Sequence, residues 1–413
     1  MNNADMIEDH CSSEGGCKIQ LIDSIMGSGK TTWAINYMND HPNEHFIYVT
    51  PRLKEVERIM NGCTSIGMKQ PQIKGSNNKS YDLKRMINEN ENIATTHEML
   101  ARLAVDDEFK EHLQLNHYHM ILDEVIEVIN PVPNLNEGDV KHVLRHLVEV
   151  DQNTGKVRWS AEDEPDIGRY SDLKKMADAG TLFYVLNKIF MWMLPISLLE
   201  SVPKLTIMTF MFEGSHLANF LRMNHLHWAT YYVNKGTLCS GKQDLTTAKQ
   251  FFSERLHIYS GKLNNIGSGR FTLSSSWWCN HEKLRKQVFK NAYNYFRNIR
   301  QVKGRDAAWS AFKNRSPSLK GFQKAFVEFN SRSTNDYMHK NTVAYLVNVF
   351  ENPDITNWFA SEQGGQIKVD QDTYALSTLL QWLWRFSIRK GGELYVYLPS
   401  ERMRNLLNQW LYS

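Results

Sequence analysis

The chain has 413 residues, which is long enough for two or three domains. Hydrophobic residues make up 42% of it and charged residues 23%, as in globular proteins with buried cores. The formal net charge is only +3, which excludes binding of a polyanion through overall charge. Any such binding would need a local cluster of basic residues.

Cysteine usage and the apolar segments favour a cytoplasmic protein without a membrane segment. The five cysteines are scattered without a CxxC pair, which is typical of free thiols in a reducing compartment and disfavours structural zinc. The polar, acidic start lacks the features of a signal peptide. The apolar stretch Leu182–Leu199 contains Asn187, Lys188 and Pro195, so a buried strand and helix explain it better than a membrane span.

Short apolar runs alternate with helical segments between residues 18 and 235. Such alternation predicts βαβ units and a parallel sheet. A polar insertion rich in Glu and Asp, at about 131–175, interrupts the pattern and is expected to be solvated and loop-like. The predicted strands are Ile19–Ile22, Phe46–Val49, Asn92–Ala94, Met120–Leu122 and Leu205–Phe210.

A second α/β domain is predicted after a linker. Residues Lys235–Gln250 contain Gly, Ser and Thr with weak periodicity, which indicates a connection between domains. A strand at Leu256–Tyr259, an amphipathic helix at Asp372–Arg389 and a strand at Leu394–Leu398 follow. The expected organisation is a polar tail at 1–17, a first domain at 18–235 and a second at 236–413.

The segment Ser24–Thr32 (SIMGSGKTT) comes directly after the first predicted strand and directly before a helix. Glycines in that place let successive backbone N–H groups point at phosphate oxygens, and the helix N-terminus adds its positive end. Lys30 is expected to reach the β and γ phosphates of ATP, and the Thr31 hydroxyl to bind Mg²⁺. The alternative, a glycine-rich turn with a surface lysine, is disfavoured by the strand before it and the helix after it. The expected nucleotide-binding residues are Gly27, Ser28, Gly29, Lys30, Thr31 and Thr32.

Two adjacent carboxylates end the apolar run Tyr118–Leu122. The carboxyl end of a strand is where an α/β sheet places its ligands, so Asp123 is predicted to hold Mg²⁺ through its water shell. Glu124 is then positioned to orient or deprotonate the attacking water. An isolated Asp-Glu pair is usually the start of a loop, and the phosphate loop is what favours the catalytic interpretation.

The segment His281–Phe326 carries twelve Lys and Arg residues and only two acidic ones. Basic residues neutralise phosphates, and the interleaved aromatic residues offer faces on which bases stack. We expect an insertion of the second domain that grips a nucleic-acid backbone through Arg297, Arg300 and Lys303. The alternative is an amphipathic helix whose aromatic residues lie in the core and whose lysines are solvated.

Together these segments resemble the motifs of superfamily 2 helicases of the DEAD/DEAH-box type found in phage and prophage replication modules. The variant phosphate loop, with Ser24 in place of glycine, is the helicase form. The matching segments, in order, are SIMGSGKTT (24–32), VTPRLKE (49–55), ATTHEML (94–100), DEVI (123–126), LTIMTFMFEGS (205–215), SRSTNDY (331–337) and YALSTLLQWLWRFSIRKG (374–391).

The resemblance implies two RecA-like domains with ATP in the cleft between them. It also implies nucleic-acid contacts from Thr50, Arg52, Thr96, His97, Arg332 and Thr334, and possible replication-protein partners. Its last motif implies catalytic roles for Gln381, Arg385 and Arg389, which are spaced to share one face of the predicted helix. An arginine there stabilises the charge that gathers on the γ-phosphate. Here Trp384 replaces the glycine of the pattern and Arg389 comes one residue late, so either arginine is a candidate for that role.

The expected activity is therefore ATP hydrolysis coupled to movement on, or unwinding of, DNA or RNA, with ATP and Mg²⁺ as cofactors. A packaging-motor ATPase shares the phosphate loop and the acidic pair, but its usual cluster of nuclease carboxylates is not evident in the sequence. A slow ATP-gated loader is a further alternative, because the last motif departs from the helicase pattern.

Overall fold

The computed structural model describes residues 17–73, 78–161, 168–312, 319–330 and 336–413. The chain divides into two compact units. The first holds the described residues up to Ser24, Ser28–Gln243 and Asn352–Val369, and the second holds Ile25–Gly27, Asp244–Glu351 and Asp370–Ser413. Within the described residues, no helix is both long and apolar enough to cross a membrane.

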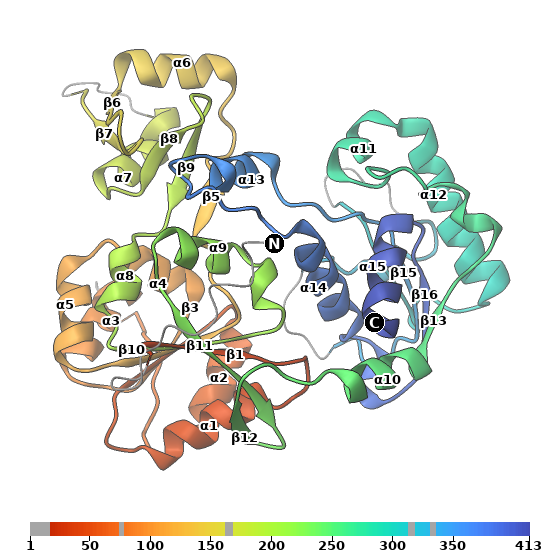
Figure 1. Ribbon diagram of the computed structural model, residues 1–413, viewed down its shortest axis with the longest axis horizontal. Helices are drawn as coiled ribbons and strands as arrows, with labels where there is room; N and C mark the ends of the chain where they lie inside the picture. Colours follow the sequence, from red (N-terminus) through yellow and green to blue (C-terminus); the bar gives the residue numbers. More distant parts are fainter. Residues whose placement is uncertain (1–16, 74–77, 162–167, 313–318, 331–335) are drawn as a thin grey trace, which may run out of the picture. The chain divides into compact units, whose positions relative to one another are not determined.

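The first unit is built on a seven-stranded sheet (Figure 1). Its strands are β1 (Ile19–Asp23), β2 (Phe46–Thr50), β3 (Ile93–Thr96), β4 (His119–Asp123), β10 (Lys204–Thr209), β11 (Trp228–Asn234) and β12 (Thr237–Ser240). They lie in the order β12-β11-β1-β10-β4-β2-β3, and every pair is parallel except β11 with β12. Strand β10 thus separates β1, which precedes the phosphate loop, from β4, which precedes the acidic pair.

Both faces of this sheet are buried, because helices cover each of them. Ile47 and Val49 of β2 pack in one hydrophobic cluster, whereas Phe46 and Tyr48 pack in another. This is why the parallel strands read as short continuous apolar runs in the sequence. The surrounding helices are α1 (Lys30–Asp40), α2 (Leu53–Gly62), α3 (Lys79–Asn88), α4 (His97–Leu103), α5 (Asp107–Leu115), α8 (Ile196–Ser201), η2 (Phe212–Gly214) and α9 (His216–Met223).

Residues 129–193 form a folded module, so the expectation of a loop-like insertion at about 131–175 was wrong. Val143, Leu147 and Phe190 belong to a hydrophobic cluster of their own. A small module exposes most of its residues, and its composition therefore reads as polar although it has a core. Its elements are β5 (Ile129–Pro131), α6 (Glu137–His146), β6 (Val148–Val150), β7 (Val157–Trp159), η1 (Gly168–Tyr170), α7 (Ser171–Asp178), β8 (Leu182–Val185) and β9 (Ile189–Met193).

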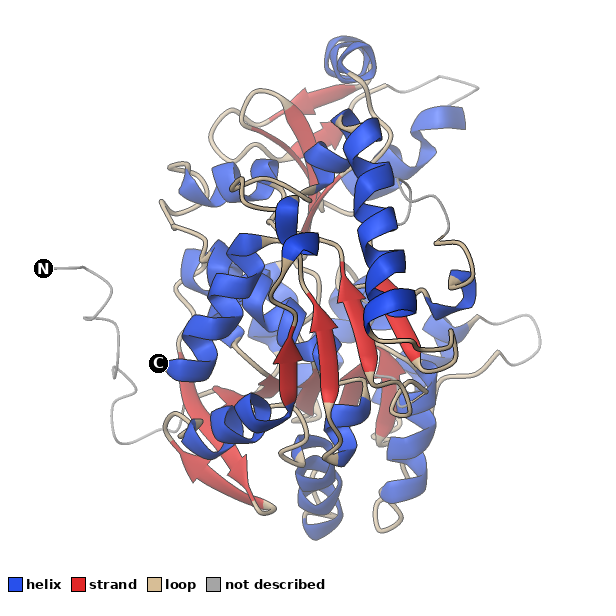
Figure 2. Cartoon of the chain, turned by 90° about the vertical axis from the view of Figure 1, so that its right-hand side faces the viewer, coloured by secondary structure: helices blue, strands red, loops and turns tan. Residues whose placement is uncertain are grey.

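The second unit contains a four-stranded sheet in which all neighbouring strands are parallel (Figure 2). Its strands are β13 (Leu256–Ile258), β14 (Ala307–Ser310), β15 (Thr342–Tyr345) and β16 (Leu394–Tyr397), in the order β13-β16-β15-β14. The expected α/β fold with two parallel-sheet domains is confirmed. The helices of this unit are α10 (Thr246–Arg255), η3 (Lys262–Asn265), α11 (Ser275–Asn280), α12 (Glu282–Asn294), the π-helical turn η4 (Tyr295–Ile299), η6 (Gln323–Ala325), α14 (Gln371–Leu383), η7 (Ser387–Lys390) and α15 (Glu401–Tyr412).

The basic segment His281–Phe326, expected as an insertion, takes part in the fold of the second unit itself. It supplies α12 and the strand β14. Phe289, Phe296 and Trp309 are at most 8% exposed and belong to the core of this unit, whereas Tyr293 is 40% exposed. For the three buried aromatic residues, the alternative of an amphipathic helix packed on a core therefore describes the segment better than a stacking surface does.

Two segments that we expected in the second domain belong to the first unit: 236–243, which contains β12 and lies within the expected linker, and Asn352–Val369. The helix of the latter segment, α13 (Pro353–Ala360), buries Trp358 and Phe359 in the cluster that also holds residues of β2 and β4. Lys188 Nζ of the module lies 2.9 Å from the carboxylate of Asp354. The sequence pattern could not show that the chain returns to the first unit here. An apolar helix face can pack on the core of either unit.

Candidate functional site

The loop between β1 and α1 has a backbone that requires its glycines. Gly27 and Gly29 have φ angles of 80° and 92°, in the left-handed region that favours glycine. Gly29 is the N-cap of α1, and its carbonyl oxygen accepts a hydrogen bond from the Trp33 backbone N–H at 2.8 Å. The helix therefore begins at Lys30, just beyond the carboxyl end of β1, and the first turn of a helix in such a place is an arrangement that binds anions.

Ser28, Thr31 and Thr32 complete the loop predicted to bind the nucleotide. Thr31 is half-buried and Thr32 is exposed. The Ser28 hydroxyl is buried, and it has no hydrogen-bond partner among the residues that the structure describes. A buried hydroxyl without a partner is costly, and a phosphate oxygen held by the loop would remove that cost. The loop therefore fits a phosphate group.

Ser24, where the strict motif has glycine, fixes the start of the loop to two neighbouring strands. Its side chain is buried, and its Oγ accepts a hydrogen bond from the Val233 backbone N–H of β11 at 2.8 Å. Its own backbone N–H donates to the Thr209 carbonyl oxygen of β10 at 3.0 Å. A glycine could make only the second of these contacts, so the serine has a structural role that the sequence alone did not reveal.

Lys30 lies among three carboxylates at the carboxyl end of the sheet. Its Nζ donates to the Ser24 carbonyl oxygen at 2.5 Å. Burial lowers the pKa of the Lys30 ammonium, while Glu124, Asp123 and Asp23 act to raise it. The structure thus brings the lysine of the phosphate loop together with both members of the predicted acidic pair.

The carboxyl group of Asp123 is strongly perturbed. Burial raises the pKa of Asp123 to about 7, and the neighbouring Glu124 carboxylate adds to the rise. The Tyr48 hydroxyl and the Lys30 ammonium act in the opposite direction. A buried carboxylate among like charges favours binding of a cation, and carboxylate oxygens are ligands that Mg²⁺ prefers.

Glu124 adopts a backbone conformation that is unusual for its residue type. Its φ angle is 65°, and its N–H donates to the Met208 carbonyl oxygen of β10 at 2.9 Å. The Thr209 hydroxyl lies 3.5 Å from Oε2 of Glu124. Strained backbone held by neighbouring strands is frequent at functional sites, where it aims a side chain. Here β10, which lies between β1 and β4, orients the carboxylate.

Asp23 is a member of this site that sequence reasoning missed. Its two carboxylate oxygens accept hydrogen bonds from the backbone N–H groups of Met211 and Phe212, at 2.8 and 3.0 Å. Burial raises its pKa, and those two hydrogen bonds counter the rise. Met211 has a φ angle of 58°, so the turn after β10 is bent toward Asp23. The sequence did contain a signal that could have identified Asp23, because it is an acidic residue at the end of the first strand.

Four residues predicted to contact nucleic acid lie at the carboxyl ends of β2 and β3, where Thr50 is paired with Thr96. The Thr96 hydroxyl caps α4 by accepting from the Met99 N–H at 3.3 Å, and His97 Nε2 lies 3.0 Å from the Asp123 carbonyl oxygen. Thr50 Oγ1 is buried and has no hydrogen-bond partner in the described part of the chain. Arg52 is the N-cap residue of α2.

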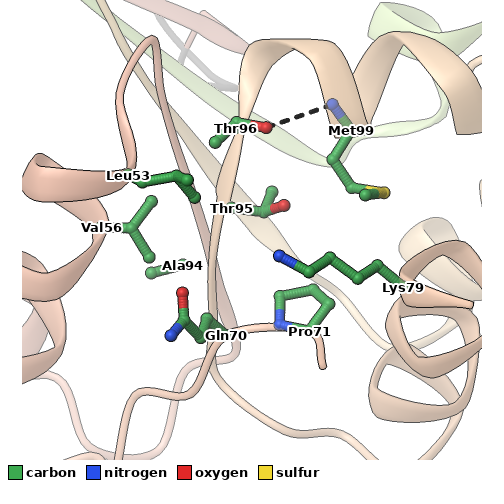
Figure 3. A pocket seen from close by; sticks show the side chains of 9 residues that line it. All are labelled: Leu53, Val56, Gln70, Pro71, Lys79, Ala94, Thr95, Thr96 and Met99. Carbon is green, nitrogen blue, oxygen red and sulfur yellow. Dashed lines mark hydrogen bonds between the residues drawn. The ribbon is translucent and has the colours of Figure 1, made fainter. Parts of the chain in front are cut away.

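A small pocket of about 40 Å³ opens beside these strand ends (Figure 3). Lys79, from the first turn of α3, points across it toward Thr95. The pocket thus adds one lysine and one further threonine to the polar groups at this edge of the sheet. Its lining residues are Leu53, Val56, Gln70, Pro71, Lys79, Ala94, Thr95, Thr96 and Met99.

The basic residues of the second domain that were predicted to bind nucleic acid are only partly free of contacts within the fold. The Arg300 guanidinium carbon lies 3.3 Å from the centroid of the Tyr395 ring, and that of Arg297 lies 5.2 Å from the centroid of Phe322. Lys303 is exposed. Arg297 and Arg300 therefore make cation–π contacts within the fold. Their binding to nucleic acid stays a prediction. The other two candidates, Arg332 and Thr334, fall outside the described residues.

The prediction that Gln381, Arg385 and Arg389 share one helix face was wrong, because α14 ends at Leu383. Phe386 and Ile388 are both fully buried. Phe386 has an extended backbone, with φ and ψ angles of −100° and −164°, so the chain leaves the helical conformation there and η7 begins anew at Ser387.

The two arginines differ in their surroundings. Arg385 is only 6% exposed, whereas Arg389 lies partly exposed in η7. Burial raises the pKa of Tyr345, and the Arg385 guanidinium is close enough to counter that rise. The side chain of Gln381 donates to the Ser377 hydroxyl at 3.2 Å. Their roles in catalysis stay predictions.

The fold resembles that of solved helicase structures. The structure of S. tokodaii Xpd4 matches with a TM-score of 0.50 at 10% identity, covering 96% of this chain and 94% of that one. An XPD helicase matches with a TM-score of 0.49 at 12% identity, covering 95% of this chain and 94% of that one. At such identity the likeness to Xpd4 shows the fold alone, which is helicase-like.

Sequence comparison identifies a family. One family model, the YonV middle domain, matches residues 129–192, and a second, the YonV C-terminal Rossmann-like domain, matches residues 250–411. The SPbeta prophage-derived uncharacterized protein YonV of Bacillus subtilis (strain 168) is 32% identical over 411 residues, which cover 95% of this chain and 98% of that protein. Identity at this level over nearly the whole of both chains shows that this chain belongs to the YonV family.

Proposed function

We propose that this chain is an ATP-dependent nucleic-acid translocase or helicase of superfamily 2. The observation that carries the proposal is the position of Lys30, on a loop built to bind phosphate, among the carboxylates of Asp23, Asp123 and Glu124. A lysine for phosphate beside a pair of carboxylates is the arrangement that phosphoryl transfer from ATP requires. The helicase-like fold supports the coupling of this chemistry to a nucleic acid.

Each residue of the site has a distinct task in this proposal. The backbone N–H groups of the loop and Lys30 bind the phosphate oxygens of ATP. Thr31 and Asp123 would hold Mg²⁺, which when bound neutralises charge on the phosphates. Glu124 orients the attacking water or takes its proton, and its strained backbone fixes the direction of the carboxylate.

The polymer substrate is proposed to be DNA or RNA. The polar groups at the carboxyl ends of β2 and β3, with Lys79 beside them, suit a sugar-phosphate backbone because such contacts need no particular sequence. His97 supports coupling to the ATP site, since its ring contacts the backbone of Asp123. A role in phage DNA replication or recombination, with replication proteins as partners, rests on the motif resemblance and on a prophage-derived relative.

The test is ATP hydrolysis by the full chain, measured with and without single-stranded and duplex DNA and RNA. We expect stimulation of several-fold by at least one of these polymers and its loss in Lys30→Ala. Lys141→Ala, at an exposed lysine of the module, is the matched control and is expected to behave as wild type. A strand-displacement assay with the stimulating polymer then distinguishes unwinding from movement alone.

A slow ATP-gated loader is the second candidate, and the end of α14 at Leu383 favours it. Because Arg385 lies in the core and Arg389 lies beyond the helix, the arginine that accelerates hydrolysis in helicases is not presented in the predicted way. Slow turnover that no polymer stimulates, with ATP binding intact, would favour the loader over the translocase.

A further inference from the structure

Phe271 is an aromatic residue that the fold presents to solvent. It is 60% exposed, although burying a phenylalanine is favourable in water. It lies on the segment 259–274, which follows the carboxyl end of β13. The carboxyl ends of parallel strands are where α/β sheets place their ligands. A large exposed ring in that place is a candidate contact surface.

The backbone on both sides of Phe271 is held in place by one buried side chain. Asn348 is fully buried, and its Nδ2 donates to the carbonyl oxygens of Arg270 and Thr272, at 2.9 and 3.0 Å. Its backbone N–H donates to the Leu273 carbonyl oxygen at 2.9 Å. Leu273 is itself buried with a φ angle of 67°, which is strained for a leucine. The ring is therefore exposed on a preorganised segment.

Phe271 is the outer member of a short ladder of rings and guanidinium groups. Its ring centroid lies 5.4 Å from that of Phe350, which follows β15. The Arg402 guanidinium carbon lies 4.2 Å from the Phe350 centroid, and that of Arg270 lies 5.4 Å from the Phe271 centroid. Arg402 also donates to the Asn348 Oδ1 at 3.0 Å and to the Val349 carbonyl oxygen at 2.8 Å. The ladder is thus fixed at its inner end and open at its outer end.

The charge of the segment that carries Phe271 favours an anionic polymer over a protein surface. At the inner end of the ladder the Arg402 guanidinium is paired with the Asp372 carboxylate at 2.6 Å, so Arg270 is the guanidinium offered to a phosphate. Between Tyr259 and Glu282 the sequence contains the basic residues Lys262 and Arg270 and no acidic residue. A nucleobase has a flat face that stacks on a phenylalanine ring, and the backbone phosphates of the same strand pair with a nearby guanidinium group.

We propose that Phe271 is a base-stacking residue that contacts one unpaired nucleotide of a single strand, backed by Phe350 and flanked by Arg270. This rests on the proposed function, because it names a contact of the second unit with the polymer on which ATP hydrolysis acts. Stacking on a phenylalanine depends on the base face and not on base identity, so the contact is tolerant of sequence.

The test uses the full chain and two fluorescently labelled strands of equal length, oligothymidylate and its fully abasic counterpart, with oligouridylate as the RNA probe. We expect Phe271→Ala to weaken binding of the intact strands by about 5- to 150-fold, the range that stacking of one base implies. Phe271→Trp should restore the affinity. Neither substitution should change binding of the abasic strand. Tyr412→Ala, at another exposed aromatic residue of the same unit, is the matched control.

Two results would overturn the inference while leaving the proposed function in place. Wild-type affinity of Phe271→Ala for every strand would mean that the ring contacts no base, as expected if it docks a protein instead. Equal weakening of the intact and abasic strands would mean that it acts through the backbone or the fold. If the wild-type chain itself binds no strand and its ATP hydrolysis is not stimulated, the proposed function falls and this inference with it.

Discussion

His97 Nε2 lies 3.0 Å from the backbone carbonyl oxygen of Asp123. This contact joins the first residue of α4, a candidate for nucleic-acid binding, to the backbone of the residue whose carboxylate is expected to hold magnesium. Both residues belong to the first unit. A nucleic acid that moves His97 would therefore also move the backbone beside the ATP site.

Replacing His97 with Ala is expected to reduce the stimulation of ATP hydrolysis by nucleic acid by about 2- to 10-fold. The reason is that one hydrogen bond, worth roughly 0.5–1.5 kcal/mol, would carry the coupling. The measurement is the ratio of turnover with a saturating strand to turnover without it. His97→Gln, which keeps a polar group of similar reach, should retain more of the ratio. An unchanged ratio in His97→Ala would show that the coupling takes another route.

Ser24→Ala is expected to lower the free energy of unfolding by about 1–3 kcal/mol, because it leaves the buried N–H of Val233 without its acceptor. Ser24→Gly, which restores the strict loop motif, should be at least as destabilising, since it adds chain flexibility. Urea denaturation measures both, with the exposed Ser240→Ala as the control. If Ser24→Gly were as stable as wild type, the serine would not be holding the loop to β11.

Much of the first sheet could be predicted from the sequence because its strands are buried on both faces. The run Phe46–Val49 predicted β2, which extends one residue further, to Thr50. The phosphate loop was recognisable because its glycines, lysine and helix start are neighbours in the chain. The acidic pair was recognisable because it directly follows an apolar strand. All of these are local signals.

Contacts between distant segments could not be predicted in this way. The hydrogen bond from Val233 to Ser24 spans 209 residues, and the one from Met211 to Asp23 spans 188. The break between α14 and η7 is a further example, because the fully buried Phe386 has an extended backbone in a segment whose apolar spacing fits one continuous helix. Tertiary burial overrode the local pattern there.

Asp123 is expected to make the stability of the nucleotide-free chain depend on pH. Burial raises its pKa from 3.8 to about 7 in the folded chain. The folded state therefore holds this proton more tightly than the unfolded state does. The stability contributed by the group is complete below about pH 3.8 and is lost as the pH rises through about 7.

Urea denaturation at several pH values between 3.8 and about 7 measures how the stability of the chain depends on Asp123. Asp123→Asn, which cannot ionise, should flatten the part of the decline that Asp123 causes, whereas Asp40→Asn at an exposed site should leave the profile unchanged. ATP hydrolysis should rise over the same interval, since binding of Mg²⁺ needs the ionised carboxylate. A decline of equal slope in Asp123→Asn would assign the pH dependence to another group.

Replacement of Arg385 is expected to lower stability, whereas replacement of Arg389 is expected to lower turnover. Arg385 is 6% exposed and lies near the fully buried Tyr345, so Arg385→Ala should lower the free energy of unfolding by about 1–3 kcal/mol through lost packing. Arg389 is more exposed, and Arg389→Ala should leave the unfolding midpoint close to that of wild type.

The effect of Arg389→Ala should appear in the turnover of ATP instead. If Arg389 stabilises the charge on the γ-phosphate, kcat should fall by up to about 10³-fold with little change in KM, because such an arginine acts in the transition state. Arg389→Lys should recover little of this rate, since a lysine cannot reproduce the two parallel hydrogen bonds of a guanidinium. Normal kcat in Arg389→Ala, together with a loss of kcat in Arg385→Ala at temperatures where that variant stays folded, would assign the role to Arg385.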